Sequence, residues 1–208
     1  MRSFSELHES IEKELADLDY PSTPKNLYDP IKYVLNIGGK RIRPILMLLS
    51  HQLFSEDIEK SLKAALGIEV FHNFTLLHDD IMDKAPLRRG LQTVHEKWDN
   101  NTSILSGDTM LVHSFDLISQ VEHKHIRKIL EVFNKSATEV CKGQQWDIDF
   151  EKREDVTLSE YLKMIEYKTS VLLAASLQIG GINGGASAEQ QDHLYEFGKN
   201  IGIAFQLK

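Results

Sequence analysis

Three aspartates within five residues are the group in this sequence best suited to chemistry. Asp79 and Asp83 stand four residues apart, so on a helix they lie one above the other. Two carboxylates placed in this way repel each other unless a cation lies between them. Asp80 is rotated by about 100° and is expected to support its neighbours. Hard oxygen ligands suit Mg²⁺, which shares its remaining sites with water and substrate phosphate. A solvated acidic helix end is the alternative.

Two basic runs flank the aspartates. The first, Gly-Gly-Lys-Arg-Ile-Arg-Pro, carries Lys40, Arg41 and Arg43 behind two glycines, and the second is the pair Arg88 and Arg89. Glycines let the backbone approach a ligand, and arginine forks match phosphate oxygens. Each run alone is more often a solvated basic turn. Together they predict two phosphate-binding groups around one carboxylate cluster.

A histidine lies on the same helical face as the aspartates. His72 comes seven residues before Asp79, which is about two turns, and could donate to a phosphate. A lone helical histidine is usually structural, so it gains weight only beside the cations. The residues therefore predict a Mg²⁺-dependent enzyme of a diphosphate substrate in an α-helical protein.

The elements that must position these residues are all helices. No proline occurs from residue 87 onward, and apolar residues recur there at helical spacing. Thr157 and Glu160 have the spacing of a capping box. No strand pattern stands out, so we predict one all-α domain over residues 1–208. The expected helices are 3–18, 27–37, 42–54, 58–82, 93–98, 101–121, 124–150, 158–180 and 188–207.

The composition excludes several other classes of protein. Lys and Arg total 24 and Asp and Glu total 31, which gives a net charge of −7 and argues against a nucleic-acid binder. No signal peptide, transit peptide or transmembrane stretch is apparent. The single cysteine, Cys141, allows no intramolecular disulfide and suits a reducing compartment. We therefore expect a cytoplasmic protein.

Five motifs together resemble the polyprenyl synthetase family of trans-isoprenyl diphosphate synthases. They are GGKRIRP, HDDIMD, LRRG, GQQWDID and YKT, in that order. The resemblance covers nearly the whole chain, from before Gly38 through Gln206. It implies an antiparallel helical bundle of the isoprenoid synthase type. It also implies a prenyltransferase that joins isopentenyl diphosphate to dimethylallyl, geranyl or farnesyl diphosphate.

The resemblance also implies roles for individual residues. Mg²⁺ would be held against the allylic diphosphate by Asp79 and Asp83, with Asp80 in support. Residues that would bind the diphosphate of isopentenyl diphosphate are Lys40, Arg43, His72 and Arg89. Arg88 and Lys168 would contact the allylic diphosphate. Thr169, Gln144 and the backbone carbonyl of Lys168 would face the allylic cation. Asp147 would line the same pocket, and Gln206 would bind substrate.

Product length is implied by the residue five positions before the first aspartate. Phe74 stands there, about 1.4 turns away, and could close the cavity in which the product grows. A plain core residue is the alternative. The resemblance to archaeal geranylgeranyl synthases favours a product of fifteen to twenty carbons.

The chain departs from the family at its end. Phe205-Gln206-Leu207-Lys208 is the last of the sequence, where the family continues into a second aspartate-rich motif. We therefore expect a chain cut in mid-helix, incomplete at the C-terminus and of low activity as given. The alternatives are a non-catalytic small subunit of a heteromeric synthase and a class I terpene cyclase, which needs no isopentenyl site. The resemblance also implies a homodimer.

Overall fold

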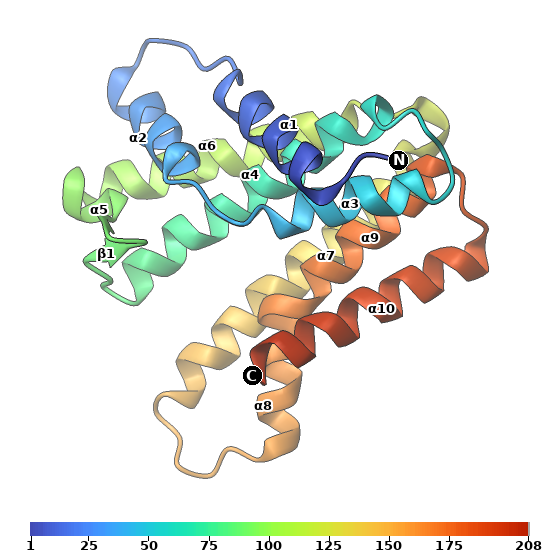
Figure 1. Ribbon diagram of the computed structural model, residues 1–208. Coiled ribbons are helices and arrows are strands. Elements are labelled where there is room, and N and C mark those ends of the chain that lie inside the picture. The colour runs from blue at the N-terminus through green and yellow to red at the C-terminus, as the bar shows by residue number, and fades with distance from the viewer. Residues whose placement is uncertain (208) are drawn as a thin grey trace. The chain divides into compact units, whose positions relative to one another are not determined.

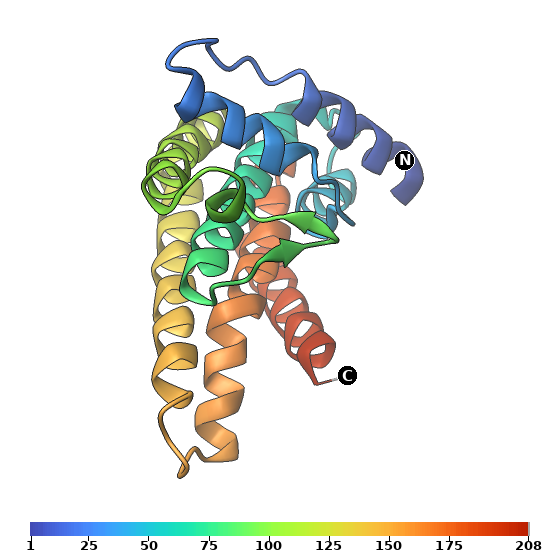
Figure 2. The same cartoon turned by 90° about the vertical axis from the view of Figure 1, so that its left-hand side faces the viewer.

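The computed structural model describes residues 1–207; Lys208, the expected point of truncation, lies outside them. The described residues are helical apart from their loops and one two-stranded hairpin, so the all-α prediction is confirmed. No helix among them is long and apolar enough to cross a membrane. Figures 1 and 2 show the chain from two directions.

The chain forms two compact units. Unit 1 comprises Met1, Leu46–Leu62 and, within the described residues, 121–207, and unit 2 comprises Arg2–Ile45 and Lys63–Gln120. Helices α3 and α4 contribute residues to both. The elements of unit 2 are α1 (Phe4–Ala16), α2 (Lys25–Asn36), the start of α3 (Ile42–Gln52), most of α4 (Glu59–Met82), β1 (Leu87–Arg88), β2 (Leu91–Gln92), α5 (Val94–Lys97) and α6 (Asn100–Ser119). Those of unit 1 are α7 (His123–Phe150), α8 (Leu158–Ile165), the π-helix η1 (Glu166–Ser170), α9 (Val171–Gly184) and α10 (Ala188–Gln206).

Unit 2 begins with a short amphipathic helix. Ser3 and Glu6 form a capping box at the start of α1, which satisfies two of its free backbone donors. One face of the helix buries Leu7, Ile11 and Leu15, which recur every four residues. The polar side chains of α1 lie on its other faces, where they can contact neighbouring loops.

Unit 1 is built around closely packed helices. Helix α9 is buried along most of its length, and α10 packs along it, as Figure 1 shows. The predicted capping box of Thr157 and Glu160 is present at the start of α8. The hydroxyl of Ser50 donates to the carbonyl of Leu177 at 2.6 Å, and the amide of Asn183 donates to the carbonyl of Lys60 at 2.6 Å. These bonds tie α3 and the start of α4 to α9.

Most helix boundaries lie within about three residues of their predicted positions, but three features differ. The hairpin β1–β2 was not predicted, because its two-residue turn, Arg89-Gly90, lacks the usual Asn-Gly signal. The helix expected over 158–180 is interrupted by η1. It then continues to Gly184, four residues past its expected end at residue 180. A Cβ at Gly180 would collide with the carbonyl of Met47, so glycine here serves the close packing of α9 against α3.

Candidate functional site

The aspartate motif lies at the C-terminal end of α4, in unit 2. Asp79 and Asp80 belong to its last turn, and the backbone N–H of Asp83 donates to the carbonyl of Asp79 at 2.9 Å, which continues the helical turn. Asp80 is buried, whereas the side chain of Asp79 is 18% exposed and Asp83 is exposed. The three carboxylates thus differ sharply in their access to solvent and ligands.

Arg88 binds the buried aspartate. Its Nε lies 2.9 Å from both carboxylate oxygens of Asp80, and its Nη2 lies 2.6 Å from Oδ1. The same Nη2 is 3.7 Å from Oδ2 of Asp79. The hydrogen bond with Asp80 raises the pKa of Arg88. Asp80 therefore fixes the arginine next to the other two aspartates.

The hairpin places Arg88 in a strand and Arg89 in its turn, so the two side chains contact different parts of unit 2. Leu87 pairs with Gln92 and Arg88 with Leu91, so Arg89 and Gly90 form the turn, with φ of 53° and 80°. Positive φ at both central residues is typical of a type I′ turn. The hydroxyl of Tyr33 donates to the carbonyl of Gln92 at 2.8 Å and holds the hairpin to α2. Figure 2 shows the hairpin beside the end of α4.

The second arginine meets the glycine loop. A Cβ added at Gly39 would lie 2.6 Å from Nη1 of Arg89, so only glycine allows the guanidinium to pack there. Arg43, in the first turn of α3, donates from Nη1 to Nε2 of His72 at 3.1 Å, and its own Nε is buried without a partner. The side chain of Lys40 is exposed. Unit 2 therefore places Arg43 against His72 and Arg89 against the loop that carries Lys40.

His72 is a neutral side chain in this environment. Arginine can only donate, so Nε2 of His72 accepts and the ring carries its proton on Nδ1. Burial lowers its pKa well below the usual range, and Arg43, Arg89, Arg88 and Arg41 lower it further. Burial also lowers the pKa of Arg43 and of Arg89. Such a cluster of partly desolvated cations is favourable for an anionic ligand.

Arg41 does not join this cluster, although the sequence counted it among the basic residues of the run. It is 3% exposed, and its guanidinium contacts Oε1 of Glu12 and Oε1 of Glu69, each at 2.8 Å. It also donates to the carbonyl of Leu35 at 2.7 Å. The two glutamates lie 29 and 28 residues away in the sequence, so no local sequence pattern could predict these ion pairs. Arg41 anchors the loop.

A second group of predicted residues lies in unit 1. Nζ of Lys168 is 2.6 Å from Oδ2 of Asp147, and Nε2 of Gln206 donates to the hydroxyl of Thr169 at 2.7 Å. Lys168 and Thr169 belong to η1, whereas Asp147 and Gln144 lie on α7 and Gln206 ends α10. One of these bonds therefore joins η1 to α7, and the other joins α10 to η1.

The π-helix is packed tightly against α7. A Cβ at Gly143 would collide with the backbone nitrogen of Lys168, so a larger residue would displace η1. The rings of Trp146 and Tyr167 stack with their centroids 5.1 Å apart. Single π turns inside α-helices are frequent at functional sites. The sequence predicted the YKT segment as functional but not this change of helix geometry.

Phe74 is buried within unit 2. Its ring centroid lies 5.6 Å from that of Phe71 and 4.8 Å from that of His78. It lies on α4 one and a half turns before the aspartates, as the spacing predicted. Burial alone fits both interpretations of this residue, a plain core side chain and the floor of a product cavity.

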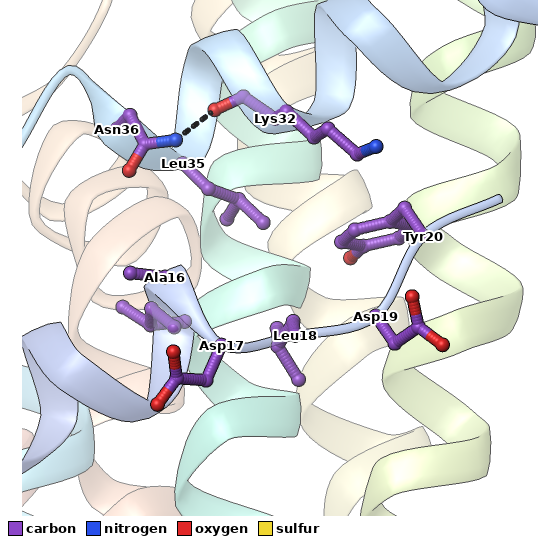
Figure 3. Close-up of a pocket in the computed structure, with 9 residues that line it drawn as sticks. Ala16, Asp17, Leu18, Asp19, Tyr20, Lys32, Leu35 and Asn36 are labelled. Atoms are coloured by element: carbon purple, nitrogen blue, oxygen red, sulfur yellow. Dashed lines mark hydrogen bonds between the residues drawn. The ribbon is translucent and has the colours of Figure 1, made fainter. Parts of the chain in front are cut away.

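A cavity of about 460 Å³ lies elsewhere in unit 2, between the end of α1, the following loop and α2 (Figure 3). Its charged groups are Asp17, Asp19 and Lys32, a set with an excess of carboxylates. None of the predicted site residues lines it. It therefore does not have the charge that a diphosphate requires.

The carboxylates of the aspartate motif are the candidate ligands for magnesium. Among residues 1–207, no three His, Cys, Asp or Glu side chains gather closely enough to hold a metal ion by themselves. Mg²⁺ does not need such a cage, because it is commonly held by one or two carboxylates with waters and substrate phosphates. Asp79 and Asp83 could supply these carboxylates, since Arg88 engages Asp80. The donor set fits Mg²⁺ shared with a phosphate ligand.

Comparison with known proteins gives consistent matches. The sequence profile of the polyprenyl synthetase family matches residues 24–208. A geranylgeranyl diphosphate synthase of Methanosarcina mazei is 46% identical over 186 residues, 88% of this chain and 57% of that protein. A geranylfarnesyl diphosphate synthase of Natronomonas pharaonis is 39% identical over 203 residues, 89% of this chain and 60% of that protein. The chain thus spans about three fifths of the length of these relatives.

A solved structure gives the same result for the fold. A crystal structure of geranylgeranyl pyrophosphate synthase matches with a TM-score of 0.96 and 47% identity, over 100% of this chain and 63% of that one. The predicted helical bundle of the isoprenoid synthase type is therefore confirmed.

Proposed function

This chain belongs to the polyprenyl synthetase family, and we propose on that premise that it condenses isopentenyl diphosphate with an allylic diphosphate. The product would be a trans-polyprenyl diphosphate of fifteen to twenty carbons. Relatives named for geranylgeranyl and geranylfarnesyl diphosphate support a short-chain product.

One observation carries the proposal. His72 and Asp79 lie on one face of α4, separated by about two turns. Arg43 contacts the histidine, and Arg88 contacts the aspartate motif at the other end. Helix α4 therefore carries a histidine that contacts the cationic group and, two turns on, the carboxylate group, as two diphosphates of different role would require. A terpene cyclase would have no use for the cationic group.

We assign the isopentenyl diphosphate to the cationic group. Arg43, Arg89 and Lys40 would neutralise its charge, and Nδ1–H of the neutral His72 would donate to a phosphate oxygen. Binding of an anion would restore the charge interactions that burial denies to Arg43 and Arg89. This diphosphate is retained during the reaction, so its site has only to bind and orient.

We assign the allylic diphosphate to the carboxylate group. Asp79 and Asp83 would hold Mg²⁺, which neutralises the diphosphate as it leaves. Asp80 would keep Arg88 beside that diphosphate. Lys168, which pairs with Asp147 in unit 1, is assigned to the same diphosphate by the family resemblance alone. The carbon–oxygen bond breaks, and the electron pair leaves with the diphosphate.

The remaining polar residues would serve the allylic cation. Gln144, Thr169 and the backbone carbonyl of Lys168 would face it with oxygen atoms, and Gln206 would hold the hydroxyl of Thr169. The double bond of isopentenyl diphosphate then attacks the cation, and a proton passes to the departed diphosphate. Phe74 would limit the length of the product.

Product formation from labelled isopentenyl diphosphate tests this proposal. The protein at its full natural length is incubated with farnesyl diphosphate, with and without Mg²⁺. We expect a twenty-carbon diphosphate only with Mg²⁺, and at least a 100-fold lower rate for Asp79→Asn, since one electrostatic contact can contribute that much. Absence of any Mg²⁺-dependent product would refute the proposal.

We also propose that the protein is a cytoplasmic homodimer. Helix α6 exposes apolar side chains, with Leu105 60% and Val112 70% exposed at positions seven residues apart. Ile104 and Phe115 extend the exposed apolar surface of the same helix. Such a surface is suited to burial against a second copy.

A further inference from the structure

The loop that carries the cationic group is held by helix α1. The loop joins α2, which ends at Asn36, to α3, which begins at Ile42. Its backbone is unusual, with φ of 83° at Gly38 and 47° at Arg41. An arginine in the left-handed region needs support from its surroundings. The loop therefore depends on contacts from other elements.

Two side chains of α1, one turn apart, supply such contacts. Nε2 of His8 lies 3.0 Å from the carbonyl oxygen of Gly39, and the carbonyl can only accept, so the imidazole donates. Glu12 accepts from Nε of Arg41 at 2.8 Å and from Nη2 at 3.4 Å. Both side chains are 34% exposed, so they lie at the rim of the unit and not in its core.

The bond from His8 reaches the residue that also receives Arg89. The guanidinium of Arg89 packs on Gly39, with no room for a Cβ between them. Lys40 is the next residue in the chain, and Arg43 follows one residue into α3. A shift of the Gly39 peptide would therefore move Lys40 directly and Arg89 by contact. The aspartate motif has its own support from Arg88 and would stay in place.

We propose that His8 and Glu12 are positioning residues for isopentenyl diphosphate. They hold the loop 38–41 in the conformation that presents Lys40, Arg43 and Arg89 to one diphosphate. Neither side chain needs to touch the substrate. This inference rests on the proposed function, because it concerns the same cationic group. It gives α1 a role in substrate binding that could not be predicted from the amphipathic pattern of its sequence.

The test compares His8→Ala with His8→Gln, whose amide nitrogen can donate from nearly the same place. Glu9→Ala, an exposed neighbour on α1, is the control. For His8→Ala we expect KM for isopentenyl diphosphate to rise about 2- to 10-fold, the range for one lost hydrogen bond, with KM for the allylic diphosphate unchanged. His8→Gln should restore most of the loss, and Glu9→Ala should match the parent protein.

Hydrogen exchange of the free protein adds a measurement that needs no turnover. The amides of residues 39–41 should exchange faster in His8→Ala than in Glu9→Ala or the parent. An equal rise in both KM values, or an unchanged KM with unchanged exchange, would overturn the inference. If the parent protein shows no turnover and no binding of isopentenyl diphosphate by calorimetry, the proposed function fails instead. Exchange at residues 39–41 would then still decide whether His8 holds the loop.

Discussion

At the scale of single residues, one charged side chain of each motif is buried in an ion pair that supports the fold, and its neighbour is accessible to a ligand. Asp80 is buried and accepts hydrogen bonds from Arg88, whereas Asp79 and Asp83 are more exposed. Arg41 is buried in ion pairs, whereas the adjacent Lys40 is exposed. In both runs, a buried ionic contact fixes the backbone from which the accessible charge projects. Replacing a buried member should therefore disturb ligand binding indirectly.

The neutral state of His72 predicts how stability depends on pH. Its pKa is lowered well below 6.5 in the folded protein, so below about pH 6.5 the unfolded chain binds more protons. Stability should fall as pH drops from 6.5 toward the folded-state pKa, by at most about 1.4 kcal/mol per pH unit for one proton. His51 and His113, whose pKa values are also lowered, add to this trend.

His72→Gln isolates the contribution of His72, because its side-chain oxygen can still accept from Arg43. Urea unfolding at pH 7.5, 6.5 and 5.5 should give a shallower loss of stability for this variant than for the parent. If the free energy of unfolding falls equally with pH in the two proteins, the pKa of His72 is not lowered in the folded state.

Substitution of Phe74 distinguishes its two interpretations, a side chain that closes the product cavity and a plain core residue. Phe74→Ala should lower the free energy of unfolding by about 3–5 kcal/mol, because a buried ring that contacts Phe71 and His78 is lost. If the ring also closes the product cavity, the products should lengthen by at least one five-carbon unit. Chromatography of the dephosphorylated products measures the change. Phe71→Ala serves as the control, and an unchanged product in Phe74→Ala would leave Phe74 a core residue.

At the scale of elements, the sequence predicted the helices well and their irregularities poorly. The bounds of α4 and α7 were predicted to within about one residue at each end. In α7 the apolar residues recur on one face, whereas α4 is a long apolar segment that is buried around most of its circumference. The hairpin β1–β2 and η1 depend on contacts distant in the sequence, such as Tyr33 with Gln92 and Gly143 with Lys168. The motifs named the candidate site residues; the support from Glu12 and Glu69 had no local signal.

Gly143 is the position where packing most directly governs η1. Gly143→Ala should lower the free energy of unfolding by about 1–3 kcal/mol, because the added methyl group overlaps the backbone of Lys168. Lys142→Ala, an exposed neighbour on α7, should be nearly neutral. Chemical denaturation measures both.

The same substitution should also affect the reaction if η1 carries Lys168 and Thr169 in their proposed roles. We expect kcat to fall in Gly143→Ala, with KM for isopentenyl diphosphate little changed, because the cationic group belongs to unit 2. A destabilised protein with full kcat would separate the packing of η1 from catalysis.

At the scale of the whole molecule, the exposed apolar surface of α6 predicts self-association. A twofold dimer places the same surface of both copies in contact, so one substitution introduces two changes into the interface. A stable interface buries about 800 Å² on each partner, and an unpaired carboxylate at its centre is costly to desolvate. Val112→Glu should therefore yield a monomer at micromolar concentration, where the parent protein is a dimer by sedimentation velocity. Leu158→Glu, on the exposed face of α8, is the matched control and should leave the dimer intact. Dimers in both variants would place the interface elsewhere, and a monomeric parent would rule out the proposed assembly.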